Sequence, residues 1–118
     1  MRMNYFVVGT NDMTAATKFY DALFEGQGLT QIPASERMTY WMGDDFAFAV
    51  AIPFDEAPAT IGNGTMVGFS FGSADEVTRL HAKALELGGT SEGEPGQRGP
   101  MFSAYLRDLD GNKICLSD

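Results

Sequence analysis

Few side chains in this 118-residue chain could carry polar chemistry. The sequence contains one histidine, His81, and one cysteine, Cys115. A cysteine nucleophile needs a neighbouring base or another group that lowers its pKa, and nothing in the sequence places His81 beside Cys115. His81 follows Leu80 on the flank of a predicted helix, where we expect a partly exposed side chain. We therefore interpret Cys115 as a small apolar thiol and predict no catalytic residue.

Two short motifs have the composition of ligand-binding loops. The run Asp108-Leu109-Asp110-Gly111-Asn112 begins like a calcium loop, but it lacks the glutamate required at the twelfth loop position, so we predict a hairpin turn. The glycine-rich run 93–99 does not lead into a helix and lacks a lysine followed by Ser or Thr. It is therefore no phosphate cradle. We predict an ordinary surface loop there, with a flexible cover over a ligand cavity as the functional alternative.

The charge of the chain limits its partners. Sixteen acidic and eight basic residues give a net charge of −8. Such a surface repels phosphates, so we expect neither nucleic acid nor an anionic membrane as a partner. It would attract a cationic small molecule, although acidity also simply keeps a protein in solution. We find no signal-peptide pattern and no apolar run of about 20 residues. The single cysteine fits a reducing compartment, and we expect a cytoplasmic protein.

The elements that must position these residues occur twice. Residues 4–52 read as a strand, a helix and three strands, and residues 65–117 repeat that order. One such unit is too short to bury both faces of its sheet, so two must pair. We predict one domain over residues 1–118. It comprises module one at 1–56, a linker at 57–64 and module two at 65–118. Pairing of the modules within one chain or between two chains stays open.

The chain is rich in aromatic residues, with nine Phe, four Tyr and one Trp. Trp41 and Tyr40 are neighbours on a predicted strand, so their side chains point to opposite faces. Rings in a cavity offer stacking area for a planar or hydrophobic ligand. We propose Trp41, Phe102 and Tyr105 as candidates to line such a cavity.

With these elements in place, the whole chain resembles the vicinal oxygen chelate superfamily, which includes glyoxalase I, bleomycin-resistance proteins and extradiol dioxygenases. Five segments carry the resemblance: residues 19–21, 53–55, 62–65, 87–90 and 105–114. The last is the most specific, because its Asp108–Asn112 turn is similar to the family's DPDGN turn, with Leu109 in place of proline.

The resemblance implies an α+β fold. Two tandem βαβββ modules would form a curled eight-stranded mixed sheet with a concave cavity. Enzymes of this family place metal ligands on the concave face, commonly one histidine on the first strand and one glutamate on the last strand of each half. The matching positions here are Tyr5, Met66, Cys115 and Ala49, with Val50 as the alternative to Ala49.

These residues are poor ligands for a catalytic divalent metal. Alanine has no donor, methionine is a weak soft donor, and a phenol, whose ordinary pKa is about 10, is a reluctant one. We therefore predict no metal and no other cofactor, and a concave cavity lined by Tyr5, Trp41, Ala49, Met66, Phe102, Tyr105 and Cys115. The predicted function is binding of a small hydrophobic or cationic molecule without catalysis. The alternatives are a metal-dependent lyase, isomerase or dioxygenase, and a non-catalytic dimerising paralogue. The resemblance also implies a homodimer.

Overall fold

The computed structural model describes all residues 1–118 and contains eight strands and two helices. The first half consists of β1 (Tyr5–Gly9), α1 (Met13–Leu23), β2 (Thr30–Ser35), β3 (Met38–Met42) and β4 (Ala47–Ala51). The second half consists of β5 (Val67–Ser70), α2 (Ala74–Glu86), β6 (Thr90–Arg98), β7 (Met101–Arg107) and β8 (Lys113–Ser117). The predicted order of one strand, one helix and three strands is therefore present in both halves.

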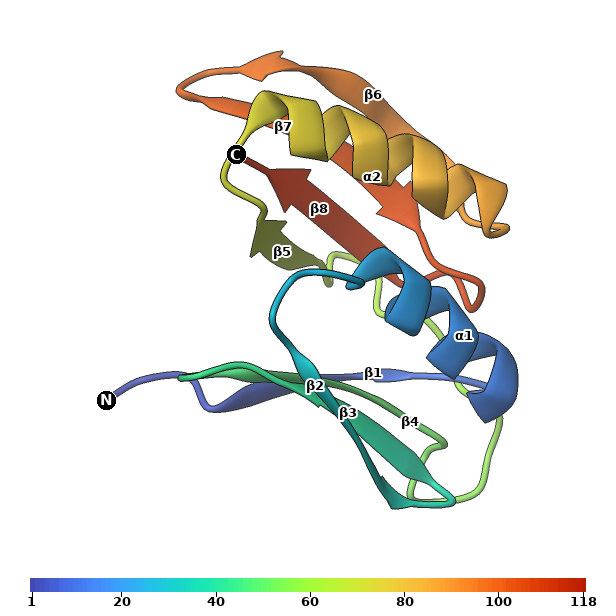
Figure 1. Cartoon of the computed structure of the whole chain (residues 1–118). Coiled ribbons are helices and arrows are strands. Elements are labelled where there is room, and N and C mark those ends of the chain that lie inside the picture. Colours follow the sequence, from blue (N-terminus) through green and yellow to red (C-terminus); the bar gives the residue numbers. More distant parts are fainter. The chain divides into compact units, whose positions relative to one another are not determined.

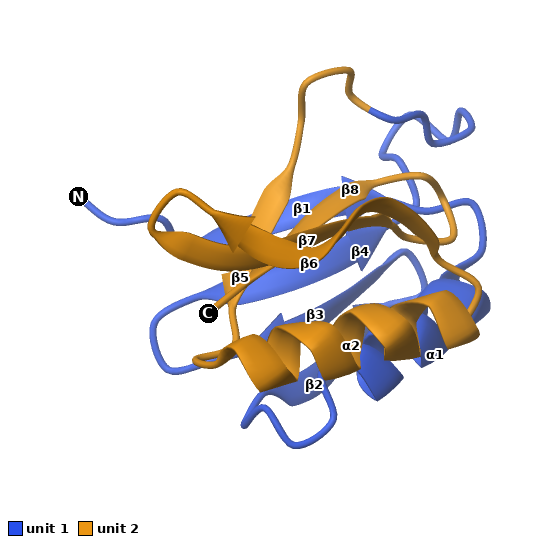
Figure 2. Ribbon diagram, turned by 90° about the horizontal axis from the view of Figure 1, so that it is seen from above, with its two compact units in different colours: residues 1–61 blue, residues 62–118 orange.

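The chain forms two compact units, residues 1–61 and residues 62–118, which Figure 2 distinguishes by colour. The division falls inside the segment 57–64 that the sequence suggested as a linker. Each unit contains one complete βαβββ module.

Each unit builds its own mixed sheet. The strand order is β1-β4-β3-β2 in the first unit and β5-β8-β7-β6 in the second. In both, the first strand runs parallel to the last strand of its module, and the other pairs are antiparallel. The eight predicted strands thus form two four-stranded sheets instead of one continuous sheet.

Helix α1 begins at a capping aspartate, Asp12. The Asp12 carboxylate accepts a hydrogen bond from the backbone N–H of Ala15 at 3.0 Å, and this satisfies a donor that the first helical turn leaves open. The neighbouring Asn11 exchanges two hydrogen bonds with the backbone of Ala59. These bonds fasten the segment after β4 to the end of β1.

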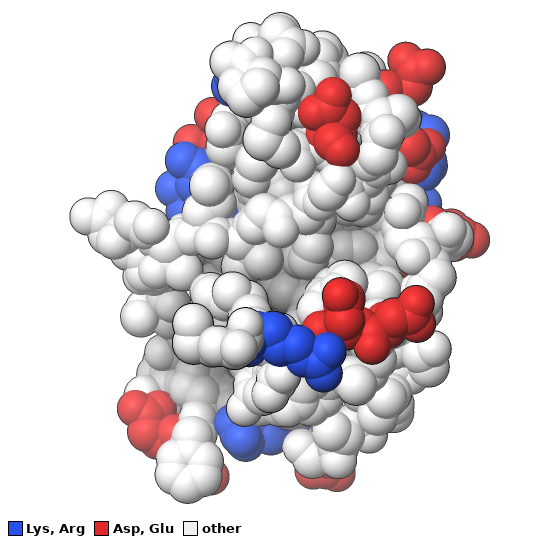
Figure 3. All heavy atoms as spheres, turned by 90° about the vertical axis from the view of Figure 1, so that its left-hand side faces the viewer, with Lys and Arg blue, Asp and Glu red and all other residues white.

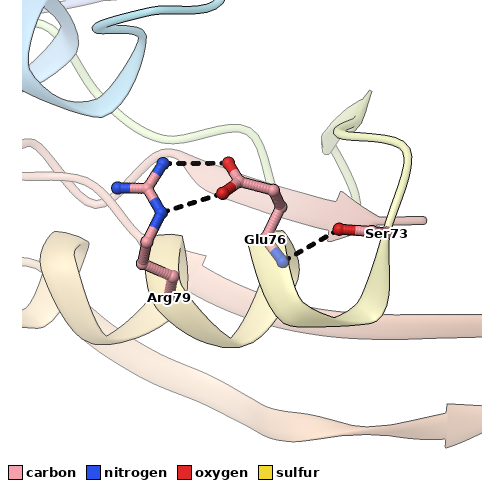
Figure 4. A network of polar contacts seen from close by, with 3 residues as sticks. All are labelled: Ser73, Glu76 and Arg79. Carbon is pink, nitrogen blue, oxygen red and sulfur yellow. Dashed lines mark hydrogen bonds and ion pairs between the residues drawn. The ribbon is translucent and has the colours of Figure 1, made fainter.

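Helix α2 is capped by Ser73, whose hydroxyl accepts a hydrogen bond from the backbone N–H of Glu76 at 3.2 Å. The Glu76 carboxylate forms a bidentate ion pair with Arg79 one turn later, with N–O distances of 2.9 and 2.8 Å (Figure 4). Local contacts of Ser73, Glu76 and Arg79 therefore fix this end of the helix.

Each helix lies across one face of its own sheet and buries an apolar stripe there (Figure 1). In the first unit, an aromatic cluster fills the space between α1 and the sheet, formed by Phe19, Tyr20, Phe24, Trp41 and Phe48. In the second unit, the fully buried residues are aliphatic instead: Val77, Leu80, Ala84, Ala104, Leu106, Ile114 and Leu116. Burial of these side chains is the main stabilising contribution to both units.

Two local expectations are wrong. The glycine-rich run 93–99 was predicted as a loop, but its greater part belongs to β6, which pairs with β7 through two irregularities in register. Bulges of this kind accommodate glycine and proline at the edge of a sheet. His81 is 2% exposed, and its Nε2 lies 3.1 Å from the Ser91 hydroxyl. A hydrogen bond to β6 thus allows a histidine on the flank of the α2 stripe to be buried. Neither helix is long and apolar enough to cross a membrane.

Candidate functional site

Each sheet has one face that its helix does not cover, which we call the helix-free face. Side chains alternate along a strand, and directly paired residues on adjacent strands share a face. The strand registers therefore place these residues on the helix-free face of the first sheet: Tyr5, Val7, Met38, Tyr40, Met42, Ala47, Ala49 and Ala51. On the second sheet the corresponding set is Gly68, Ser70, Met101, Ser103, Tyr105, Arg107, Lys113, Cys115 and Ser117.

The helix-free face of the first sheet is apolar and aromatic. Tyr5 is 55% exposed, and its ring meets the Tyr40 ring edge-on with the centroids 6.1 Å apart. Ala49 pairs in register with Tyr40 on one side and Val7 on the other, and it is fully buried. The structure thus brings the predicted residues Tyr5 and Ala49 together around Tyr40, which sequence reasoning did not select.

Two candidate cavity residues lie on the opposite, helix-covered side. Trp41 is 2% exposed, packs against Tyr20, and donates a hydrogen bond from its indole N–H to Asp21 of α1 at 2.9 Å. Phe102 alternates with Ser103 and therefore shares the helix-covered side with Ala104. The indole adds more apolar area to the core than its strand neighbour Tyr40 would, whereas the Phe102 ring is only half-buried.

The helix-free face of the second sheet is polar and cationic. Tyr105 and Cys115, both predicted, are direct register partners at its centre. The Arg98 guanidinium carbon lies 5.1 Å from the centroid of the Tyr105 ring, and the Lys113 ammonium nitrogen lies 5.4 Å from it. Met66, the remaining predicted residue, precedes β5 and is 45% exposed.

Burial and charge oppose each other at Cys115. Burial raises the pKa of the thiol, whereas a hydrogen bond with Tyr105 and the charges of Arg98 and Lys113 act to lower it. The net shift is upward, so the thiol stays protonated at neutral pH. This supports the interpretation of Cys115 as an inert thiol.

One carboxylate belongs to this part of the second sheet. Glu92 accepts a hydrogen bond from Arg107 Nε at 2.6 Å, and this bond and the Arg107 charge lower the pKa of Glu92. Arg107 is therefore paired, while Arg98 and Lys113 form no ion pair with a carboxylate. The local charge on this face is positive although the chain carries −8 overall. On the side of the molecule drawn in Figure 3, Lys and Arg side chains are interspersed with Asp and Glu side chains.

Comparison with known proteins identifies the family. The model of the Glyoxalase/Bleomycin resistance protein/Dioxygenase superfamily matches residues 2–116, and the chain belongs to that family. A solved glyoxalase/bleomycin resistance protein from Albidiferax ferrireducens is 37% identical over 98% of this chain and 96% of that chain, with a TM-score of 0.91.

More distant structures share the fold. A glyoxalase-related enzyme from Fulvimarina pelagi is 17% identical over 99% of this chain and 87% of its own, with a TM-score of 0.80. A glyoxalase/bleomycin resistance protein/dioxygenase family enzyme from Burkholderia phytofirmans is also 17% identical, over 99% and 98%, with a TM-score of 0.79. No protein of curated function matches the chain.

The residues at the positions that the family resemblance assigns to metal ligands do not suit a divalent metal. In strand register Ala49, and not Val50, corresponds to Cys115, because Ala49 is the partner of Tyr40 just as Cys115 is the partner of Tyr105. Ala49 has no donor, and Cys115 offers one protonated thiol. No three His, Cys, Asp or Glu side chains of the chain lie close enough together to hold a metal ion. The donor set therefore does not fit the nitrogen and carboxylate ligation that such chemistry uses.

Proposed function

We propose that this protein binds a small molecule on the helix-free face of a sheet, without a catalytic metal. The observation that carries the proposal is the set of residues at the four expected ligand positions, which are Tyr5, Ala49, Met66 and Cys115. They offer ring, methyl and sulfur surface in place of hard donors. Membership of the glyoxalase and bleomycin-resistance family supports a binding role, because that family includes proteins that sequester a ligand.

The Tyr5–Tyr40 pair is the structural feature that favours an apolar or planar ligand on the first sheet. The exposed Tyr5 ring and the half-buried Tyr40 ring provide contact area that loses little conformational entropy on binding. Ile32 and Met42 add exposed apolar surface, since Ile32 pairs in register with Tyr40 and Met42 lies two residues along the same strand. A hydrophobic molecule of one or two rings would cover this surface.

The expectation that the protein binds a cationic small molecule has less support. It rested on the net charge of −8, but charges more than about 8 Å apart are largely screened at physiological salt. The charges that a ligand on the second sheet would meet first are those of Arg98 and Lys113. We therefore propose hydrophobic ligands ahead of cationic ones.

Isothermal titration with a panel of hydrophobic and cationic aromatic compounds tests the proposal. We expect at least one neutral aromatic compound to bind metal-free protein, and Tyr40→Ala to weaken that binding about five- to tenfold. Phe54→Ala is the matched control, because Phe54 is an exposed aromatic residue of the same unit outside both sheets. Failure of every compound to bind would contradict the proposal.

Elemental analysis of the purified protein supplies an independent test. We expect no stoichiometric Ni, Zn, Fe or Mn, and a stoichiometric ion would favour the alternative of a metal-dependent enzyme. We also propose a homodimer, for which light scattering should give about twice the chain mass of 12.8 kDa.

A further inference from the structure

The two unpaired cations on the second sheet are the feature that the proposed function leaves unexplained. Arg98 and Lys113 come from β6 and β8, on either side of β7, and both lie within 5.4 Å of the centroid of the Tyr105 ring. Attraction to the ring offsets part of the mutual repulsion of the two cations, but it neutralises neither charge. Neither cation forms an ion pair, and Glu92, the one carboxylate that Lys113 affects through its charge, is already paired with Arg107, so this face keeps an excess positive charge.

Arg98 is held in place by neutral partners. Its Nη1 donates to the Ser103 carbonyl and its Nη2 donates to the Glu94 carbonyl at 2.8 Å. These bonds brace the irregular part of β6, but they leave the formal charge of the guanidinium unbalanced. A guanidinium has five N–H donors, and the Nε–H of Arg98 has no partner within the chain. A structural role for Arg98 therefore does not exclude a further acceptor.

Lys113 has no such structural role. Its ammonium group makes no hydrogen bond or ion pair within the chain, and its contact is with the Tyr105 ring. Its side chain is only partly exposed, because β8 lies between β5 and β7 in the sheet. An ammonium group on an interior strand, with three donors unused, is suited to receive an anion.

Gly93 makes room for this arrangement. A Cβ atom at position 93 would lie 2.9 Å from Cδ2 of Tyr105 and 3.2 Å from Nη2 of Arg98. Any larger residue would therefore force the Tyr105 ring, the Arg98 guanidinium or both to move. Ser103 and Ser117 lie on the same face, but both are buried and the Ser117 hydroxyl already donates to the Phe69 carbonyl.

We propose that the helix-free face of the second sheet binds the carboxylate or phosphate group of a small molecule through Arg98 and Lys113, with Tyr105 beneath it. This inference rests on the proposed function, and it specifies that the bound ligand carries a negative charge. The Arg98 fork and the Lys113 ammonium would supply charge-assisted hydrogen bonds to the anionic oxygens. The remainder of the ligand would be neutral and apolar.

Four probes that share a phenyl ring test the proposal on metal-free protein: benzoate, phenyl phosphate, benzamide and benzylammonium. Affinities are measured by titration calorimetry, and the binding face is identified by amide chemical shifts. We expect benzoate or phenyl phosphate to bind about tenfold more tightly than benzamide, and benzylammonium to bind most weakly. The stronger of the two anions identifies carboxylate or phosphate as the recognised group.

Lys113→Gln should weaken the binding of the anions about tenfold and leave benzamide unchanged, whereas Lys113→Arg should keep anion affinity within about twofold. Lys18→Gln is the matched control, because it removes the same charge from an exposed position on α1. Lys113 is chosen over Arg98 because its replacement breaks no hydrogen bond within the chain.

The outcomes separate the two proposals. Equal affinity for benzoate and benzamide, or no effect of Lys113→Gln, would overturn the anion site while the binding function stands. If benzylammonium bound most tightly, the anion site would be overturned, and the negative net charge of the chain would determine which ligands bind. Binding of none of these probes and of no compound in the wider panel would overturn both.

Discussion

The two modules have the same framework around their central strand pair but different chemistry. In the first sheet Tyr40 is opposite Ala49, and in the second Tyr105 is opposite Cys115. Counting along the last strands from these pairs, Ala47 occupies the place that Lys113 occupies in the second sheet. The first helix-free face is therefore apolar, and the second carries unpaired positive charge.

This difference shows which part of the structure determines ligand polarity. The tyrosine beside the last strand is present in both modules, so it supplies contact area in either case. The charge depends on two positions, Arg98 and Lys113, that lie outside the core beneath α2. In this fold, helix-covered faces maintain the framework and helix-free faces can differ.

The largest expected loss of stability comes from substitutions on the helix-covered faces, which the two modules share. Trp41 and Leu106 take equivalent positions, opposite Phe48 and Ile114, and both are buried. We expect Trp41→Ala and Leu106→Ala each to lower the free energy of unfolding by about 3–5 kcal/mol. Urea denaturation followed by circular dichroism measures this loss. Tyr40→Ala, with a partly exposed side chain, should cost far less, and a similar cost for Tyr40 and Trp41 would show that the faces are wrongly assigned.

The two modules also differ in the hairpin turn before the last strand, and the next largest effect is expected there. In the second module, the buried Asp108 carboxylate accepts hydrogen bonds from the backbone of Asp110 and Asn112 and from the Asn112 amide, each at 2.9 Å. We expect Asp108→Ala to lower the free energy of unfolding by about 2 kcal/mol. Asp44→Ala in the corresponding turn of the first module is the control and should cost less than about 0.5 kcal/mol. Equal losses would mean that the carboxylate does not define the turn.

The pH dependence of Cys115 tests the cationic surroundings of the second face. Burial raises the pKa of this thiol, so the folded state keeps its proton at a pH where the unfolded state releases it. The contribution of the protonated thiol to stability is thus full below the unfolded pKa of about 8.5 and is lost as the pH rises through the folded pKa.

Rates of iodoacetamide alkylation between pH 7 and pH 10 measure this folded pKa, with urea-unfolded protein as the reference. Because Lys113 acts to lower the pKa of the thiol, Lys113→Gln should shift the alkylation midpoint to higher pH. A midpoint in the folded protein below that of the unfolded chain would contradict the assignment.

The smallest expected difference lies between the helix starts. Helix α2 has the Glu76–Arg79 ion pair in its first turns, whereas the first turn of α1 contains no acidic residue. Arg79 is half exposed, so Arg79→Gln should lower the free energy of unfolding by no more than about 0.5 kcal/mol. Thermal unfolding in low and high salt tests this, and a loss above 1 kcal/mol would show that the pair is more than a surface contact.

Much of the fold could be predicted because its determinants are local. The Asp12 and Ser73 caps, the buried stripes of both helices and the Asp108 turn all follow from residue types at short spacings. Strand β6 could not be predicted this way, since its glycines and proline suggest a loop and only pairing with β7 keeps them extended.

The candidate site was less predictable, and the reason is geometric. Alternation shows that Tyr40 and Trp41 point to opposite faces, but it does not show which face the helix covers. The approach of Arg98 and Lys113 to one ring depends on the register of three strands and on the irregular pairing of β6. No spacing in the sequence encodes this approach. The net charge of −8 therefore does not predict the positive charge on the helix-free face of the second sheet.

The parallel pairing of β1 with β4, and of β5 with β8, has a consequence for biosynthesis. The strand made first in each module finds its neighbour only when the strand made last has left the ribosome. Until then an edge with open backbone donors and acceptors is exposed, and such edges can join to those of other chains. A pause in translation shortly before β4 or β8 would prolong this interval and favour aggregation of the nascent protein.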